Sequence, residues 1–148
     1  MNIKTTYLNF TDKLSKLNDI PLLAMRLVLA YGFYMPAKNK WEDIHSIGEW
    51  FASMNYPAPL FNAYLAASTE ALGVILLTLG LATRFISFPL IITMVVAIVT
   101  VHWENGFEGG SNNGFEIPLY YIVMLSTLFI NGGGRFSLDY LINKYRKK

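Results

Sequence analysis

Residues 59–82 read PLFNAYLAASTEALGVILLTLGLA, and Glu70 is the one charged side chain among them. An α-helix needs roughly 20 consecutive apolar residues to cross a hydrocarbon core about 30 Å thick. This stretch meets that requirement, and Pro59 stands in its first turn, where a missing N–H group is tolerated. The stretch therefore predicts a membrane-spanning helix with one carboxylate near the middle of the bilayer.

Three further stretches are apolar over a similar length: residues 20–37, 85–103 and 117–131. Over the whole chain, 53% of residues are hydrophobic and 15% are charged, whereas about a quarter are charged in soluble domains. Two amphipathic stretches, one before residue 20 and one after residue 134, fit helices that lie on a membrane surface. The sequence thus predicts an all-α integral membrane protein, a four-transmembrane-helix bundle with short interfacial helices.

The placement of basic residues predicts the orientation in the membrane. Most lysines and arginines lie before the first apolar stretch, between the second and third, or after the fourth, whereas Lys38 and Lys40 lie on the opposite side. Cytoplasmic segments carry such an excess, so both termini are predicted to be cytoplasmic. The expected divisions are a cytoplasmic interfacial helix at 1–19, the four-helix domain at 20–134 and a basic amphipathic tail at 135–148.

The 38–58 segment, predicted to face outward, carries apolar residues at helical spacing. The stripe consists of Trp41, Ile44, Ile47, Phe51 and Met54, with Trp50 beside it. Tryptophan favours the depth of the lipid headgroups. We expect this segment to form a helix that covers the outer end of the bundle.

Arg26 and Glu70 are ionisable residues inside predicted spans, where an unpaired charge is costly. Arg26 lies about 7–8 Å in from the inner side at 1.5 Å per residue, and Glu70 about 16–17 Å in from the outer side. In a core about 30 Å thick, these depths differ by roughly 5 Å, which an arginine side chain can bridge. We therefore predict a buried ion pair, whose role is either to fix the register of two helices or to handle a proton or ligand.

A second group of chemically capable side chains gathers at the predicted outer end. A histidine there can bind a metal, transfer a proton or hydrogen-bond a quinone carbonyl, and it also fits a plain interfacial residue. Two histidines are few for haem or copper ligation, and an acidic residue at the start of the fourth stretch also stabilises a helix N-terminus. The candidate ligand site comprises Lys38, His45, His102, Glu104, Glu116 and Tyr120.

The chain contains no cysteine, so no disulfide, thiolate metal site or cysteine-ligated cofactor is expected. The basic residues lie mostly towards the two ends, which suits anionic lipid headgroups better than nucleic acid. The sequence contains no phosphate-binding loop, nucleophile elbow or metalloprotease motif. We therefore predict the lipid bilayer as a partner, and we do not expect the chain to be a catalyst on its own.

Several motifs resemble the DoxX family of membrane proteins. Arg26 is followed by LVLAYG and then by Lys38, Glu70 opens the sequence EALG, and residues 79–84 read LGLATR. Ala97 and His102 are similar to the third helix of that family, and GGGRFSLD at 132–139 resembles its glycine-rich exit. The resemblance covers about residues 20 to 140, and the 48–51 and 113–121 segments look more like the HvfX branch.

The resemblance implies a bacterial inner-membrane protein in a redox or metal- and sulfur-handling context, without fixing a reaction. The leading hypothesis is an accessory membrane subunit that acts beside a redox or metal-handling system, in which a quinone or a peripheral redox or metal-handling protein would do the chemistry; the cofactor itself is left open. One alternative is a quinone-linked oxidoreductase subunit with its own outer site at His102 and Glu116. The other is a small proton-coupled transporter, acting as an oligomer with Arg26 and Glu70 as its gate.

Overall fold

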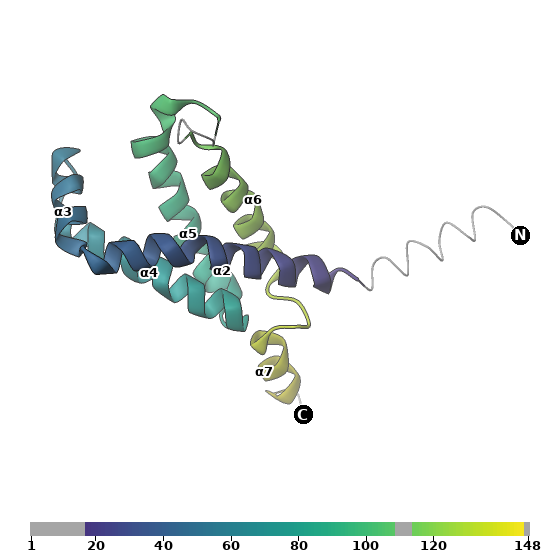
Figure 1. The fold of residues 1–148 in the computed structure, drawn as a ribbon. Helices are drawn as coiled ribbons and strands as arrows, with labels where there is room; N and C mark the ends of the chain where they lie inside the picture. Colours follow the sequence, from purple (N-terminus) through teal and green to yellow (C-terminus); the bar gives the residue numbers. More distant parts are fainter. Residues whose placement is uncertain (1–16, 109–113, 147–148) are drawn as a thin grey trace, which may run out of the picture.

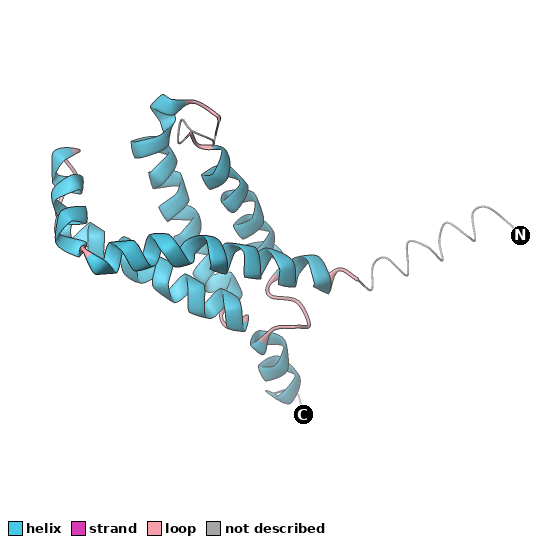
Figure 2. Cartoon of the chain, viewed as in Figure 1, coloured by secondary structure: helices cyan, strands magenta, loops and turns pink. Residues whose placement is uncertain are grey.

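The computed structural model describes residues 17–108 and 114–146, and every regular element in this part of the chain is helical (Figures 1 and 2). The helices that carry the fold are α2 (Asp19–Glu42), α3 (Ile44–Ser53), α4 (Pro59–Leu79), α5 (Thr83–Ala97), α6 (Glu116–Asn131) and α7 (Leu138–Arg146). A π-helical turn, η1 (Ile98–His102), and a 3-10 turn, η2 (Trp103–Asn105), continue α5. The interfacial helix expected at 1–19 falls almost wholly outside the described residues.

Three helical segments are long and apolar enough to cross a membrane: Asp19–Glu42, Pro59–Leu79 and Thr83–Asn105. The fourth apolar helix, α6, has 16 residues, or about 24 Å at 1.5 Å per residue. That length is short for a core of about 30 Å. The all-helical class is confirmed, and a fourth crossing by α6 stays a prediction.

The first span is longer than its apolar stretch indicates. It continues through Pro36 as far as Glu42, so Lys38 and Lys40 lie on a helix and not in a loop. Asp43 ends the span and starts α3, because its carboxylate accepts hydrogen bonds from the backbone N–H and the hydroxyl of Ser46. These bonds hold the pKa of Asp43 below its usual value. The helix expected around residues 41–54 is confirmed as α3.

The helices are arranged as two pairs. The most extensive contacts join α2 to α4 and α5 to α6, and α3 packs on α4. In Figure 1 the α5–α6 pair runs at a wide angle to the α2–α4 pair, with α3 at one end of the molecule and α7 at the other. The main core lies where the two pairs meet and consists of Leu29, Ala30, Phe33, Leu77, Ile86, Leu90, Met94, Leu125 and Leu128.

Two glycines allow close approach between helices. A Cβ atom on Gly73 of α4 would lie 2.9 Å from a methyl group of Leu90 on α5, and one on Gly32 of α2 would collide with the hydroxyl of Tyr121 on α6. Outward faces carry large exposed apolar side chains, such as Tyr31, Phe85 and Ile130. Lipid is the solvent that suits such faces.

Candidate functional site

A cavity of about 510 Å³ lies between α4 and the α5–η1 segment, beside α3. We call it the α3 pocket. Its volume is typical of sites for small organic molecules. Its walls are mostly apolar and aromatic, and its polar groups come from four helices: the lining residues are Lys40, Trp50, Phe51, Tyr56, Asn62, Leu65, Ala66, Thr69, Glu70, Pro89, Ile92, Thr93, Val96, Ala97, Thr100, Val101 and His102.

A buried ion pair forms the polar centre of the α3 pocket. The Lys40 ammonium donates to both carboxylate oxygens of Glu70, at 3.0 and 2.8 Å. Glu70 is only 2% exposed, while the side chain of Lys40 keeps 20% of its surface exposed. A carboxylate buried this deeply is stable as an ion only with a close cation. The pair therefore holds two opposite charges at the wall of a largely apolar cavity.

The predicted ion pair between Arg26 and Glu70 is wrong, although both side chains are buried as expected. The Arg26 guanidinium donates to four backbone carbonyls, those of Leu77 at 2.9 Å, Thr78 at 3.2 Å, Gly133 at 2.8 Å and Phe136 at 3.0 Å. Leu77 lies seven residues beyond Glu70, about 10 Å further along α4. The estimate of depth in the membrane did not reveal this separation. Glu70 instead has a nearer cation, Lys40, because α2 continues past Pro36.

The arginine instead satisfies groups that a helix end leaves unpaired. The last carbonyls of an α-helix have no partner within the helix, and guanidinium is a planar group with five N–H donors. Arg26 thus joins the end of α4 to the glycine-rich segment after α6. We call this set of contacts the Arg26 junction.

His102 reaches the α3 pocket from the π-helical turn η1. A π-turn carries one more residue per turn than an α-helix would and is frequent at functional sites. Thr100 and Val101 of the same turn also line the pocket. The irregular end of α5 therefore contributes several adjacent side chains to one cavity.

The other predicted ligand-site residues lie elsewhere. Lys38 is paired with Glu42 at 3.5 Å on an exposed helix face, and His45 and Glu104 are exposed. The Tyr120 hydroxyl donates to Glu116 at 2.8 Å. His102 is the only member of that set among the residues that line the α3 pocket. Within the described residues, no three His, Cys, Asp or Glu side chains come together as a metal site would require.

Lys40 is the functional residue that sequence reasoning missed. The signal was present, because Phe33, Ala37 and Lys40 follow one another at helical spacing on the face that α2 buries. Ending the first apolar stretch at residue 37 hid that pattern. Proline need not end a helix where neighbouring elements satisfy the freed backbone groups.

Comparison with known proteins places these features in a family. The family model described as DoxX matches residues 21–103. The chain belongs to the DoxX family. The matched region contains every residue that lines the α3 pocket, whereas α6 and α7 lie beyond it.

Two curated relatives resemble the DoxX chain over most of its length. A Haemophilus influenzae protein named "Uncharacterized protein" is 33% identical over 86% of this chain and 86% of its own. A Bacillus subtilis protein named "Putative oxidoreductase CatD" is 29% identical over 90% of this chain and 96% of its own. No solved structure matches the chain.

Proposed function

We propose that this DoxX protein is a membrane subunit of a redox system and binds a quinone in the α3 pocket. The observation that carries the proposal is the Lys40–Glu70 pair, buried at the wall of a largely apolar cavity within a membrane-spanning region. The name of the Bacillus relative, which contains the word oxidoreductase, supports the redox context.

The pocket offers what a quinone needs. Aromatic and aliphatic side chains, among them Trp50, Phe51 and Leu65, suit the ring and the first part of an isoprenoid tail. The Lys40 ammonium can donate a hydrogen bond to a quinone carbonyl. The Glu70 carboxylate can accept the hydroxyl of a quinol, and His102 stands at the same cavity as a further hydrogen-bonding group.

The chain's own contribution is binding and proton handling. Reduction of a quinone to a quinol takes up two electrons and two protons. A peripheral partner protein supplies the electrons, in agreement with the accessory-subunit hypothesis. The buried pair keeps the empty pocket electrically neutral and gives the ligand one donor and one acceptor when the pair opens.

We further propose a bacterial inner-membrane location, with α6 as the fourth crossing and both termini in the cytoplasm. The excess of basic residues at the α7 end supports this orientation, and both relatives come from bacteria. The α3 pocket then opens towards the outer half of the bilayer. The motifs at 48–51 and 113–121 support placement near the HvfX branch.

A short-tailed ubiquinone analogue tests the proposal in detergent, through the quenching of Trp50 fluorescence. Ala66 lines the pocket, whereas Leu72 of the same helix is exposed to lipid, so Ala66→Phe fills the cavity and Leu72→Phe is its matched control. We expect saturable quenching in the wild type and in Leu72→Phe, and a loss of affinity of about tenfold or more in Ala66→Phe. Equal quenching in all three proteins, or none that saturates, would show that the α3 pocket is not a quinone site.

A further inference from the structure

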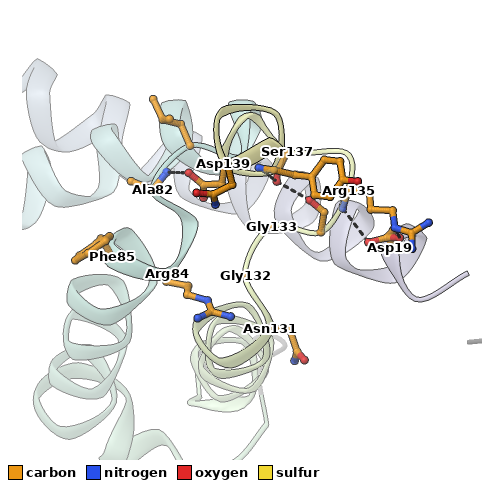
Figure 3. A pocket seen from close by; sticks show the side chains of 14 residues that line it. Asp19, Ala82, Arg84, Phe85, Asn131, Gly132, Gly133, Arg135, Ser137 and Asp139 are labelled. Atoms are coloured by element: carbon orange, nitrogen blue, oxygen red, sulfur yellow. Dashed lines mark hydrogen bonds and ion pairs between the residues drawn. The ribbon is translucent and has the colours of Figure 1, made fainter. Parts of the chain in front are cut away.

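A second cavity, of about 610 Å³, lies at the opposite end of the molecule. We call it the α7 pocket. It forms where the turn between α4 and α5, the segment after α6 and the start of α7 come together (Figure 3). Its lining residues are Asp19, Leu81, Ala82, Arg84, Phe85, Asn131, Gly132, Gly133, Gly134, Arg135, Ser137, Asp139, Tyr140 and Asn143.

Both carboxylates of the α7 pocket are occupied by interactions within the fold. Asp139 accepts from the backbone N–H groups of Ala82 at 2.7 Å and Thr83 at 2.9 Å, where α5 begins. Asp19 accepts from the backbone N–H of Arg135 at 2.8 Å and lies 3.4 Å from its Nε (Figure 3). The carboxylates therefore fix the walls of the pocket.

Arg84 differs from every other charged group at the α7 pocket. Its side chain makes no ion pair or hydrogen bond with another residue of 17–108 or 114–146. In Figure 3 its side chain lies beside Gly132. A Cβ atom on Gly132, which has φ +79°, would lie 3.3 Å from Arg84 Nε. The glycine therefore lets the arginine lie directly against the backbone.

The charge balance around the α7 pocket favours an anion. Arg84 and Arg135 line it, and Arg26 lies directly behind it, bound to the Gly133 carbonyl. Three guanidinium groups thus surround two carboxylates. Arginine is the residue best suited to bind the oxygens of a phosphate, because its N–H groups form two parallel hydrogen bonds.

We propose that the α7 pocket binds a phosphate group, with Arg84 as its principal ligand and Arg135 as the second cation. The phosphate belongs either to an anionic phospholipid headgroup or to a soluble phosphate compound. Phe85 is 84% exposed next to Arg84, and Phe136 and Tyr140 are exposed near Arg135. These aromatic side chains would meet the glycerol and acyl chains of a lipid whose headgroup occupied the pocket.

Native mass spectrometry of the protein in dodecyl maltoside, a phosphate-free detergent, tests this site. Dioleoyl phosphatidylglycerol is added, with dioleoylglycerol as the lipid that lacks a phosphate. The variants are Arg84→Gln and Arg146→Gln. Each removes one exposed cation from the same end of the molecule, but Arg146 does not line the pocket. A second arm titrates inorganic phosphate into lipid-free protein and follows binding by calorimetry.

We expect the wild type and Arg146→Gln to retain phosphatidylglycerol, and Arg84→Gln to retain it about tenfold less. Arg84-dependent binding of inorganic phosphate without lipid selectivity would instead identify a soluble phosphate as the source. Equal lipid retention in all three proteins, equal losses in both variants, or no binding of either probe would overturn the proposal. Circular dichroism confirms that both variants fold, which their exposed positions lead us to expect.

Discussion

The two ends of the molecule bury a cation in opposite ways. In the α3 pocket, Lys40 faces a carboxylate at 2.8 Å. At the Arg26 junction, a guanidinium with 1% exposure faces four backbone carbonyls and forms no ion pair with a described residue. Backbone carbonyls cannot take up a proton, so the junction has one charge state and one geometry. The Lys40–Glu70 pair can open, exchange a proton or give its hydrogen bonds to a ligand.

The different partners of Arg26 and of the Lys40–Glu70 pair indicate different roles for these buried charges. Arg26 connects α4 to the segment between α6 and α7. Asp139 of α7 accepts hydrogen bonds from the backbone N–H groups of Ala82 and Thr83 and so caps the start of α5. This end is fixed by hydrogen bonds from several elements. At the α3 pocket the two charges belong to α2 and α4 only, and the wall includes the π-turn η1. The contacts of Arg26 indicate a stabilising role, and ligand binding by the Lys40–Glu70 pair stays a proposal.

Loss of Arg26 should have the largest effect of any substitution that tests this comparison. Arg26→Leu removes the arginine donor from four buried or partly buried carbonyls, of which that of Leu77 keeps the backbone N–H of Gly80 as a donor. Each carbonyl left unsatisfied costs about 1–3 kcal/mol. The total is comparable to the whole stability of a small domain. We expect no folded monodisperse protein from Arg26→Leu, as judged by size-exclusion chromatography in mild detergent.

Arg26→Lys is the informative control for that loss. A lysine keeps the charge and three donors but not the planar fork, so we expect it to recover only part of the wild-type yield. A folded, wild-type-like Arg26→Leu protein would contradict the structural role of the junction.

Substitution in the α3 pocket should cause a smaller loss of stability, which a second substitution should largely restore. Glu70→Leu leaves the Lys40 ammonium without its partner, at an expected cost of about 3–5 kcal/mol for half of a buried pair. Because Lys40 keeps partial contact with solvent, we expect a value near the lower limit. The double variant Lys40→Met, Glu70→Leu should recover most of the loss in thermal unfolding.

A double variant that is merely additive would mean that Lys40 and Glu70 do not stabilise one another. The same double variant should lose quinone affinity while it regains stability. That combination separates binding from folding, and no Arg26 variant is expected to show it.

The sequence predicted the elements better than their pairing. Four apolar helices, the outer helix α3 and the amphipathic helix α7 follow from hydrophobic spacing, because burial in lipid or protein imposes a helical period. The burial of Arg26 and Glu70 was likewise predictable from their places in apolar stretches. Their partners were not, because spacing gives depth along one helix but not the rotation and crossing of two helices. The predicted end of the first span at residue 37 added to the error, since the helix continues to Glu42 and places Lys40 opposite Glu70.

The candidate site shows the same limit. The outer end was predicted as the place of ligand binding, and His102 of the predicted set lines a cavity at the α3 end of the molecule. Lys38, His45, Glu104, Glu116 and Tyr120 were grouped with His102 because they are polar and near the same membrane surface. Polar residues near one surface can still lie on different helix faces. A pocket requires side chains that converge, and the α3 pocket recruits Lys40, Thr69 and Glu70 from inside the bundle.

A pair of glycines offers the finest test of how tightly the Arg26 junction is built. Gly80 and Gly106 both have positive φ, +67° and +74°, so alanine at either position incurs backbone strain of about 1–3 kcal/mol. The strain at Gly106 is at least as large as that at Gly80, because Gly106 has ψ −165°, a region that glycine almost alone adopts, whereas Gly80 has ψ 37°. The surroundings differ. A Cβ atom on Gly80 would lie 2.6 Å from Arg26 Cζ and 2.7 Å from Ser137 Cβ, whereas one on Gly106 would meet no atom within 4 Å.

Gly106→Ala therefore measures backbone strain alone, at a position where that strain is no smaller, and Gly80→Ala measures backbone strain together with displacement of the guanidinium. We expect Gly80→Ala to lower the free energy of unfolding by about 1–3 kcal/mol more than Gly106→Ala, as overpacking in a rigid site does. The measurement is chemical unfolding in mixed micelles, followed by tryptophan fluorescence. A loss in Gly80→Ala that is smaller than that in Gly106→Ala would show that Arg26 moves aside at little cost, and the contrast between a fixed junction and an adaptable pocket would then fail at the junction.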